Sequence, residues 1–528
     1  MSYFVKLKDP QPCLFLSWSY ICYYTVCYSL IFPFMQRYLL GLVVFFSGAL
    51  VMIFEIAGTR LLAPYVGTSM YIWTSLIGII LGSLSLGYFV GGRLADSEPS
   101  IRILSGILAL GGLFVEMTLF TVSFVVGLSE GISDLRLRAV VLSLFLFAPA
   151  SVCLGMVSPY VAKLALHDLH KTGKTMGNLS ALSTMGSIAG TFLAGFVLLP
   201  LVGVKFILIC IAACLVILSF LCAIHKKWLI LGGFVPLLFL IFSPTSSLYS
   251  AGQNDPVSVS VESAYSHIMV FDSVHNQTGR PIRSMRINNE SSSAMFLDGD
   301  DLVYEYTKFY RLANHFAPTL SRALMLGGAA YSYPKDFLDM FPEATLDVVE
   351  IDPAVTKLSR AYFSLPTTDR LHIFHEDGRT FLHRSTDTYD VIFGDAFLSL
   401  YSIPYQLTTK EAVEEMYRLL DDDGIVLTNV ISSVEGDKGK FLRAEYETYA
   451  SVFPHVEVFP VRTNTEGDRR QNIILFASKS DKPLVFENAD EELQSYLSQR
   501  WTRPIPHDVP VLTDDFAPVE YYSLLLTQ

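Results

Sequence analysis

The chain has 528 residues, of which 51% are hydrophobic and only 17% are charged, a composition too apolar for a soluble protein of this length. Charge is divided unevenly, since residues 1–244 hold 14 Lys and Arg against 8 Asp and Glu, whereas residues 245–528 hold 24 against 42. We therefore expect a membrane domain followed by an acidic soluble domain. An acidic surface argues against a nucleic-acid partner and suits cationic ligands.

Apolar stretches of the length that crosses a bilayer fill the first 244 residues. Seven follow one another from residue 38, at 38–57, 72–92, 103–127, 139–160, 179–199, 203–223 and 228–243. The apolar segment 11–34 is either one more span or part of an over-extended start, because Met35 is an alternative initiation site. Gly, Ser and Ala are frequent from Ser180 to Gly195, which predicts closely packed helices. Residues 1–244 are thus predicted to form a multi-pass α-helical membrane domain.

Three segments follow the membrane domain. Residues 245–256 contain Ser, Pro, Gly and Asn, which is typical of a linker. Residues 257–300 alternate polar and apolar side chains around a turn signal at 276–279, which predicts a small antiparallel β subdomain. Residues 301–528 alternate strand-like and helix-like runs, which predicts an α/β domain.

Four short apolar runs in this last domain each end in glycine or a carboxylate. They are Leu324–Gly328, Val348–Glu350, Leu371–Asp377 and Tyr389–Asp395. Runs of this length, separated by helix-like segments, predict a doubly wound, Rossmann-like parallel sheet. Ligands of such sheets bind at the carboxyl ends of the strands, so these four ends mark the predicted site.

The residues at the four ends favour a nucleoside ligand. Glu350 follows the glycine turn by about 20 residues, which suits a carboxylate that accepts hydrogen bonds from two ribose hydroxyls. Asp377 is placed to read an adenine amino group, and Asp395 lies beside the reactive part of the ligand. The Gly327-Gly328 turn lacks both the G-x-G-x-x-G pattern and a basic residue, which argues against a dinucleotide. S-adenosylmethionine, or a relative without phosphates, is the better match.

The sequence contains no cysteine or histidine spacing that is typical of a metal site or a disulfide framework. All seven cysteines precede residue 223 and lie in apolar segments, so we expect them to be small buried hydrophobic side chains. His372 and His375 have no further ligands at metal-binding spacing, and we expect no metal.

From about Val257 to Lys479 the chain resembles the polyamine aminopropyltransferases, the spermidine synthase family. With its membrane half it resembles bacterial proteins in which such a domain is fused to a transporter-like membrane segment. The matching segments are 264–268, 297–299, 327–328, 350–352, 377–378 and 389–395. The resemblance implies decarboxylated S-adenosylmethionine as the donor. It assigns Glu350 to the ribose, Asp377 to the adenine and Asp395 to catalysis, and adds Asp352 and Gly378 to the binding residues.

Three positions depart from the pattern of this family. Ala330 stands where the family has an Asp that faces the amines, Leu398 replaces a second carboxylate after the fourth strand, and Leu302 replaces a Gln. Binding of a nucleoside is therefore better supported than binding of any particular amine.

The predicted reaction is aminopropyl transfer to an amine acceptor. Asp395 would orient the amine and take its proton, and Tyr265, Tyr304 and Tyr306 are candidates for lining a cation pocket. One alternative is methyl transfer from S-adenosylmethionine, since the same strand-end carboxylates suit both donors. Another is a transporter or sensor whose soluble domain binds a polyamine or nucleoside without turnover.

The expected location is the cell membrane, with the lipid bilayer and a small-molecule amine as partners and homo-oligomer formation left open. The basic residues between spans favour a cytoplasmic N-terminus, with eight inside and four outside. Seven spans from that start would put the soluble domain outside the cell, where S-adenosyl compounds are not expected. Either one segment does not cross, or the segment 11–34 counts as a span against the charge rule, or the domain faces outward. Of these we expect a cytoplasmic catalytic domain.

Overall fold

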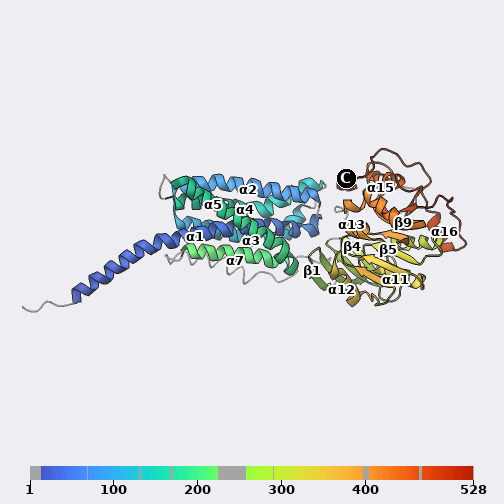
Figure 1. Ribbon diagram of the computed structural model, residues 1–528, viewed down its shortest axis with the longest axis horizontal. Helices are drawn as coiled ribbons and strands as arrows, with labels where there is room; N and C mark the ends of the chain where they lie inside the picture. The colour runs from blue at the N-terminus through green and yellow to red at the C-terminus, as the bar shows by residue number, and fades with distance from the viewer. Residues whose placement is uncertain are drawn as a thin grey trace, which may run out of the picture.

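The computed structural model describes residues 13–223 and 257–526, apart from 68, 130, 133, 167–170, 289, 397–402 and 463–466. A helical part and an α/β part lie end to end (Figure 1). The predicted span 228–243, the linker 245–256 and Leu398 lie outside the described residues.

Long apolar helices make up the first part. They are α1 Cys13–Val66, α2 Met70–Ser97, α3 Ile101–Ser129, α4 Leu135–Ala165, α5 Thr172–Leu193, which continues through the π-helical turn η2 Ala194–Leu198 and α6 Leu199–Leu201, and α7 Val204–Ala223. In the described residues, six helical stretches are long and apolar enough to cross a membrane. Each of the six overlaps a range in which the sequence predicts a span.

Small residues let these helices approach closely, as the sequence predicts. A methyl group added to Gly186 or Gly190 of α5 would overlap backbone atoms of α1. The same holds between α2 and α4, where Gly87 and Gly91 face the backbone around Gly155. Backbone contact of this kind gives a packed bundle rather than a set of separate anchors.

A small antiparallel sheet begins the second part and confirms the predicted β subdomain. Its strands are β1 Val257–Glu262, β2 His267–Val274, β3 Pro281–Ile287 and β4 Glu290–Phe296, paired in that order. Ile268, Val270 and Met285 are buried and pack into the core of the larger domain. This sheet therefore forms one wall of the α/β domain.

The larger sheet has seven strands in the order β10-β11-β9-β8-β5-β6-β7. They are β5 Arg322–Leu326, β6 Thr345–Val349, β7 Leu371–Phe374, β8 Tyr389–Gly394, β9 Leu420–Ser432, β10 His455–Pro460 and β11 Gln471–Ser478. Strands β5 to β9 pair in parallel, whereas β11 and β10 are antiparallel at one edge. The predicted Rossmann-like α/β fold is confirmed.

Helices cover both faces of this sheet (Figure 1). One face carries α11 Ser332–Met340, α12 Pro353–Tyr362 and α16 Glu491–Leu497; the other carries α13 Gly378–Arg384, α14 Lys410–Leu419 and α15 Lys440–Ala450. Alternate residues of β5 belong to the two cores, since Ala323 and Met325 face one and Leu324 and Leu326 the other. Burial on both faces explains why the strands are continuous apolar runs.

The chain reverses direction across the sheet at β5. From β5 it proceeds through β6 to β7 and then returns to β8 on the opposite side of β5. The connections therefore diverge at the carboxyl ends of β5 and β8 and leave a crevice there, where open α/β sheets bind their ligands.

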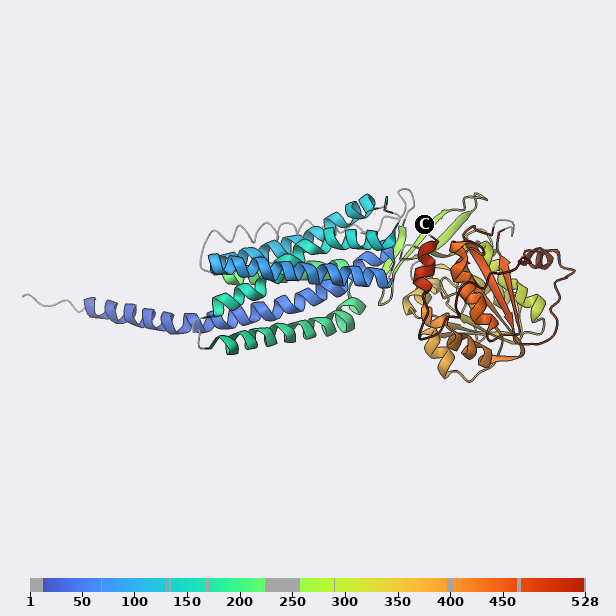
Figure 2. The ribbon, with the colours of Figure 1, turned by 90° about the horizontal axis from the view of Figure 1, so that it is seen from above.

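The two parts meet at the end of the bundle that holds the start of α2 (Figure 2). Glu520 of the C-terminal helix α17 (Val519–Leu525) accepts a hydrogen bond from the backbone N–H of Met70 at 2.8 Å. Leu524 packs into the core of the bundle. Burial raises the pKa of Glu262 on β1, and nearby Arg60 and Lys205 oppose that rise.

Candidate active site

A cavity of about 680 Å³ opens at the carboxyl ends of the central strands. Six carboxylates line it, namely Glu290, Glu305, Glu350, Glu376, Asp377 and Asp395. Two arginines, Arg462 and Arg470, also line it. The predicted residues Gly327, Gly378, Tyr304 and Tyr306 lie in the same lining.

The turn after β5 brings backbone close to this cavity. Gly327 has a φ of +93°, and a Cβ there would overlap the backbone carbonyl of Asp395, so only glycine fits. The N–H of Gly327 donates to the carbonyl of Val349 at 2.9 Å, and the N–H of Asp395 donates to Leu326 at 2.8 Å. These two bonds tie together the ends of β5, β6 and β8.

The turn after β5 has Ala330 where the resembling family has an Asp, and the structure shows where this residue lies. Ala330 is fully buried and does not line the cavity. Gly328 is also absent from the lining, and a Cβ there would lie 2.7 Å from the ring of Tyr331. The backbone N–H of Gly328 instead donates to Glu350. The turn thus acts through its main chain.

Glu350 is held by backbone amides at the end of β6. Its Oε2 accepts from the N–H groups of Gly328 at 3.0 Å and Ala329 at 3.2 Å, and its Oε1 accepts from Asp352 at 2.9 Å. Burial raises the pKa of Glu350, and these three donors oppose the rise. The carboxylate has about four acceptor sites and three are taken, so Oε1 can accept one ligand hydroxyl without breaking this arrangement.

Asp352 and Tyr265 lie outside the cavity lining. Asp352 caps α12 by accepting from the N–H of Ala354 at 3.0 Å, and its other oxygen accepts from the hydroxyls of Ser263 and Ser266. Tyr265, in the same β1–β2 turn, is 47% exposed. These contacts fasten the small sheet to the α/β domain.

Asp377 and Gly378 lie at the end of β7. Asp377 caps α13, because its Oδ1 accepts from the N–H of Thr380 at 3.0 Å. A Cβ on Gly378 would lie 3.3 Å from a methyl of Leu407, so a larger side chain would crowd the cavity wall. This end of the crevice is acidic and is narrowed by Leu407.

Asp395 lies at the end of β8 between two hydrogen-bond donors. Its Oδ2 accepts from the hydroxyl of Tyr306 at 3.1 Å, and its Oδ1 accepts from the amide of Asn429 at 3.0 Å. Burial raises the pKa of Asp395 to about 6, and these donors oppose the rise. The group is therefore mostly ionised at neutral pH yet basic enough to take a proton.

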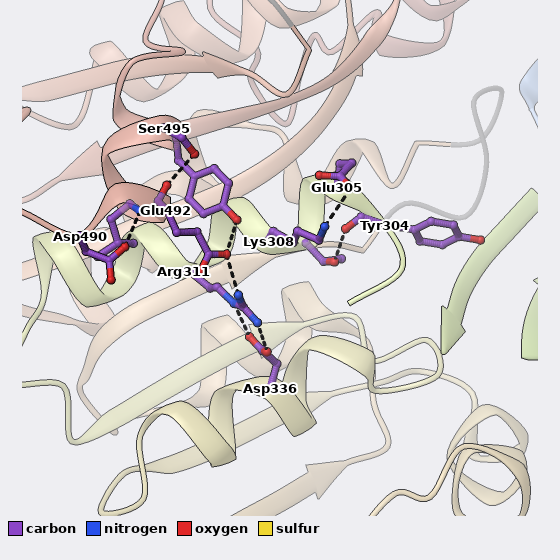
Figure 3. Close-up of polar contacts among 11 residues, drawn as sticks. Tyr304, Glu305, Lys308, Arg311, Asp336, Asp490, Glu492 and Ser495 are labelled. Carbon is purple, nitrogen blue, oxygen red and sulfur yellow. Dashed lines mark hydrogen bonds and ion pairs between the residues drawn. The ribbon is translucent and has the colours of Figure 1, made fainter. Parts of the chain in front are cut away.

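Two tyrosines form an aromatic wall beside Asp395. The rings of Tyr304 and Tyr306 are stacked with centroids 6.2 Å apart, and both line the cavity. Glu305 between them turns to Lys308, whose Nζ lies 2.9 Å from its Oε1, while the Tyr304 ring points away from that pair (Figure 3). Aromatic faces beside a carboxylate suit a cationic ligand.

The sequence interpretation missed the wall formed by β9 and β11. Asn429 lies on β9, and its Oδ1 accepts from the amide of Asn472 on β11 at 3.0 Å. Gln471, Asn472 and Arg470 line the cavity with Arg462, which follows β10. A polar Asn429 inside the buried run Ile425–Val430 was the one signal that could have indicated this wall.

Comparison with known proteins identifies the kind of domain that holds this cavity. The model of the spermine/spermidine synthase domain matches residues 315–489. The chain carries a spermine/spermidine synthase domain. The polyamine aminopropyltransferase of Vibrio vulnificus is 25% identical over 304 residues, which are 54% of this chain and 97% of that protein.

Two further similar proteins match smaller shares of both chains. The probable polyamine aminopropyl transferase of Bifidobacterium longum is 28% identical over 50% of this chain, which spans only 61% of that relative's length. The crystal structure of a probable spermidine synthase from Corynebacterium glutamicum has 27% identity and a TM-score of 0.39, covering 45% of this chain and 84% of that chain.

Proposed function

We propose that the protein is a membrane-bound aminopropyltransferase that moves an aminopropyl group from decarboxylated S-adenosylmethionine to an amine. The observation that carries the proposal is Asp395, a half-buried carboxylate that lines the cavity, accepts two hydrogen bonds and has its pKa raised to about 6. The matched domain and the relatives supply the reaction class.

The donor would lie across the ends of β5, β6 and β7. Glu350 would accept a hydrogen bond from a ribose hydroxyl through Oε1, and Asp377 would accept one from the adenine amino group. The sulfonium would then face Asp395, with the rings of Tyr304 and Tyr306 beside it. No phosphate has to be bound, which agrees with the absence of basic residues in the turn after β5.

The chemistry needs a positioned, unprotonated amine. A primary amine has a pKa of roughly 10.4, so it is mostly ammonium at neutral pH and must lose a proton before it attacks. Asp395 would take this proton directly or through water. The nitrogen lone pair then forms a bond to the methylene carbon next to sulfur. The carbon–sulfur bond breaks with its electron pair going to sulfur, which releases neutral methylthioadenosine.

Product analysis of the full chain in detergent tests the proposal. With decarboxylated S-adenosylmethionine and a panel of amines, we expect methylthioadenosine and an aminopropylated amine. S-adenosylhomocysteine formed from S-adenosylmethionine would instead identify a methyltransferase. Donor binding without either product would identify a binding protein.

Two variants test whether the activity resides in the described cavity. Asp395→Asn is expected to lower kcat by about 100-fold or more while the protein still binds the donor. The matched control is Asp339→Asn, since Asp339 is exposed on α11 and does not line the cavity. Equal turnover by both variants would remove Asp395 from the reaction.

We further propose that residues 1–244 form the membrane domain, 245–256 the linker, 257–300 the β subdomain and 301–528 the catalytic domain. The catalytic domain is placed in the cytoplasm, where the donor is made. Because this domain packs against the bundle end that holds Arg60 and Lys205, the orientation runs against the charge preference between spans. The soluble half contains no cysteine, so Asp339→Cys labelled with an impermeant maleimide tests it. Labelling only after cells are opened is expected, and labelling of intact cells would place the domain outside.

A further inference from the structure

The cavity has two unlike sides, which are separated by Asp395. Toward β6 and β7 the lining carries Glu350, Glu376 and Asp377. Toward β9, β11 and β10 the lining residues that the structure describes are amides, apolar groups and two arginines, and none of these strands contributes a carboxylate. If the donor occupies the acidic side, the acceptor must approach over the other.

Amide groups lead outward from Asp395 on this second side. The Asn472 amide donates to Asn429, and the Asn429 amide donates to Asp395, each at 3.0 Å. Arg470 precedes Asn472 by two positions and therefore lies on the same face of the chain as it enters β11. Arg462 lies across from it, since its backbone N–H donates to the Gln471 side chain at 2.7 Å.

The charge on this side favours an anion. Guanidinium groups stay charged at any physiological pH and match a carboxylate with two parallel hydrogen bonds. The helix α9 (Glu305–Lys308) packs against β11, and its Glu305 is already engaged by Lys308 at 2.9 Å (Figure 3). A second ammonium on the acceptor would therefore meet two positive charges at this end of the cavity.

We propose that Arg462 and Arg470 form a carboxylate-binding subsite, so that the acceptor is an amino acid with its reacting amine and its carboxylate at opposite ends. The inference rests on the proposed function and names its acceptor class. The amine faces Asp395 and the carboxylate faces the arginines. The transfer forms one nitrogen–carbon bond, breaks one carbon–sulfur bond and passes one proton to Asp395, giving an N-aminopropyl amino acid and methylthioadenosine.

The spacing of the strands limits the length of the acceptor. Strands β8, β9 and β11 are consecutive neighbours, so β11 lies about 10 Å from β8. Arginine side chains reach back over part of this distance. Chains of about four carbons therefore suit the gap between Asp395 and the guanidinium groups.

Three acceptors of equal length provide the test on the full chain in detergent, with decarboxylated S-adenosylmethionine as donor. They are 4-aminobutyrate, butylamine and 1,4-diaminobutane, which carry a carboxylate, a methyl group and an ammonium at the far end. We expect kcat/KM for methylthioadenosine release to fall in that order. Preference for 1,4-diaminobutane would overturn this inference and leave the proposed function standing. Absence of methylthioadenosine with all three would overturn both.

Substitution of Arg462 and Arg470 tests whether these two residues cause the preference for 4-aminobutyrate. The double variant Arg462→Gln, Arg470→Gln is expected to lower kcat/KM for 4-aminobutyrate by about tenfold or more and to leave butylamine unchanged. Arg469→Gln removes one positive charge from a residue outside the cavity lining and is expected to change neither. Both arginines of the pair are exposed, and thermal melting of the variants checks that the fold is kept.

A carboxylate could also come from an undecarboxylated donor, and a binding measurement separates the two sources. Affinity for S-adenosylmethionine is expected to be the same in the double variant and the parent. If the double variant instead loses affinity for S-adenosylmethionine while its kcat/KM for 4-aminobutyrate is unchanged, the arginines recognise the donor, and the acceptor assignment is wrong.

Discussion

The two sides of the cavity are built by different means. On the side of β6 and β7, carboxylates follow parallel strands and are held by main-chain N–H groups, as Glu350 is by three of them. On the side of β9 and β11, side chains of an antiparallel pair hold one another, as Asn472 holds Asn429. The first side is fixed by the fold itself, whereas the second can change its specificity by substitution of single side chains.

This difference suggests a division of labour. A nucleoside donor needs a rigid, acidic, phosphate-free cradle, and the strand ends provide it. On our proposal the acceptor is recognised on the other side, where polarity depends on a few residues of β9 and β11. Asp395 lies between the two sides, because it follows β8, the strand between β9 and β5.

The largest effect is expected at Gly327, where both sides meet. Gly327→Ala would push its Cβ into the carbonyl of Asp395 at a φ of +93°. Turnover should fall by about 100-fold or more, and the free energy of unfolding by about 1–3 kcal/mol. Gly279, with a φ of +70° and open space around it, provides the control, because Gly279→Ala adds strain without overlap. Similar turnover in the two variants would show that the contact with Asp395 is unimportant.

Glu350→Gln tests the donor side alone. The new amide would place an N–H against the backbone donors that now bind the carboxylate, and it would weaken the bonds to ribose. The KM for the donor is expected to rise by about 10- to 100-fold, with the order of acceptors unchanged. A variant whose acceptor order changes would show that the two sides are not independent.

Asn429→Ala tests the link between the sides through pH. Asp395 acts as a base in its ionised form, so kcat/KM should fall as pH drops through about 6. Asn429 lowers the pKa of Asp395, and removal of its amide should move this acidic limb to higher pH, costing a few-fold in rate at pH 7 and more below it. A pH profile of each protein measures the limb. If the acidic fall in kcat/KM stays at the same pH in Asn429→Ala, a group other than Asp395 causes it.

The smallest effect on turnover is expected for Asp352→Asn. Asparagine can still cap α12, but the bonds from Ser263 and Ser266 are weakened. The free energy of unfolding should fall by about 1–2 kcal/mol, while the KM for the donor changes by less than about threefold. A donor KM as strongly raised as in Glu350→Gln would return Asp352 to the binding site.

The sequence predicted the side of the cavity at β6 and β7, the proposed donor side, because its residues follow a local rule. Glycine and carboxylates after buried apolar runs indicate parallel strand ends, and the structure brings Gly327, Glu350, Asp377 and Asp395 to one cavity. Asp352 was grouped with them because the segment 350–352 resembles the family pattern. At that point the chain has already turned into α12, so its carboxylate faces the helix N-terminus instead.

The side at β9 and β11, the proposed acceptor side, could not be predicted in the same way. Asn429 and Asn472 meet only because β9 pairs with β11 in one particular register, across 43 positions of sequence. No local pattern specifies that register. In the membrane half the reverse holds, since hydropathy alone placed the six helices, while the position of the catalytic domain against the bundle depends on long-range contacts such as that of Glu520 with Met70.

The most direct test of the central claim is a structure of the full chain with methylthioadenosine bound. The ribose is expected within hydrogen-bond distance of Glu350, the adenine amino group near Asp377, and the sulfur facing Asp395 with the β9–β11 side open. A nucleoside bound over β9 and β11, or outside the cavity, would contradict the assignment of both sides.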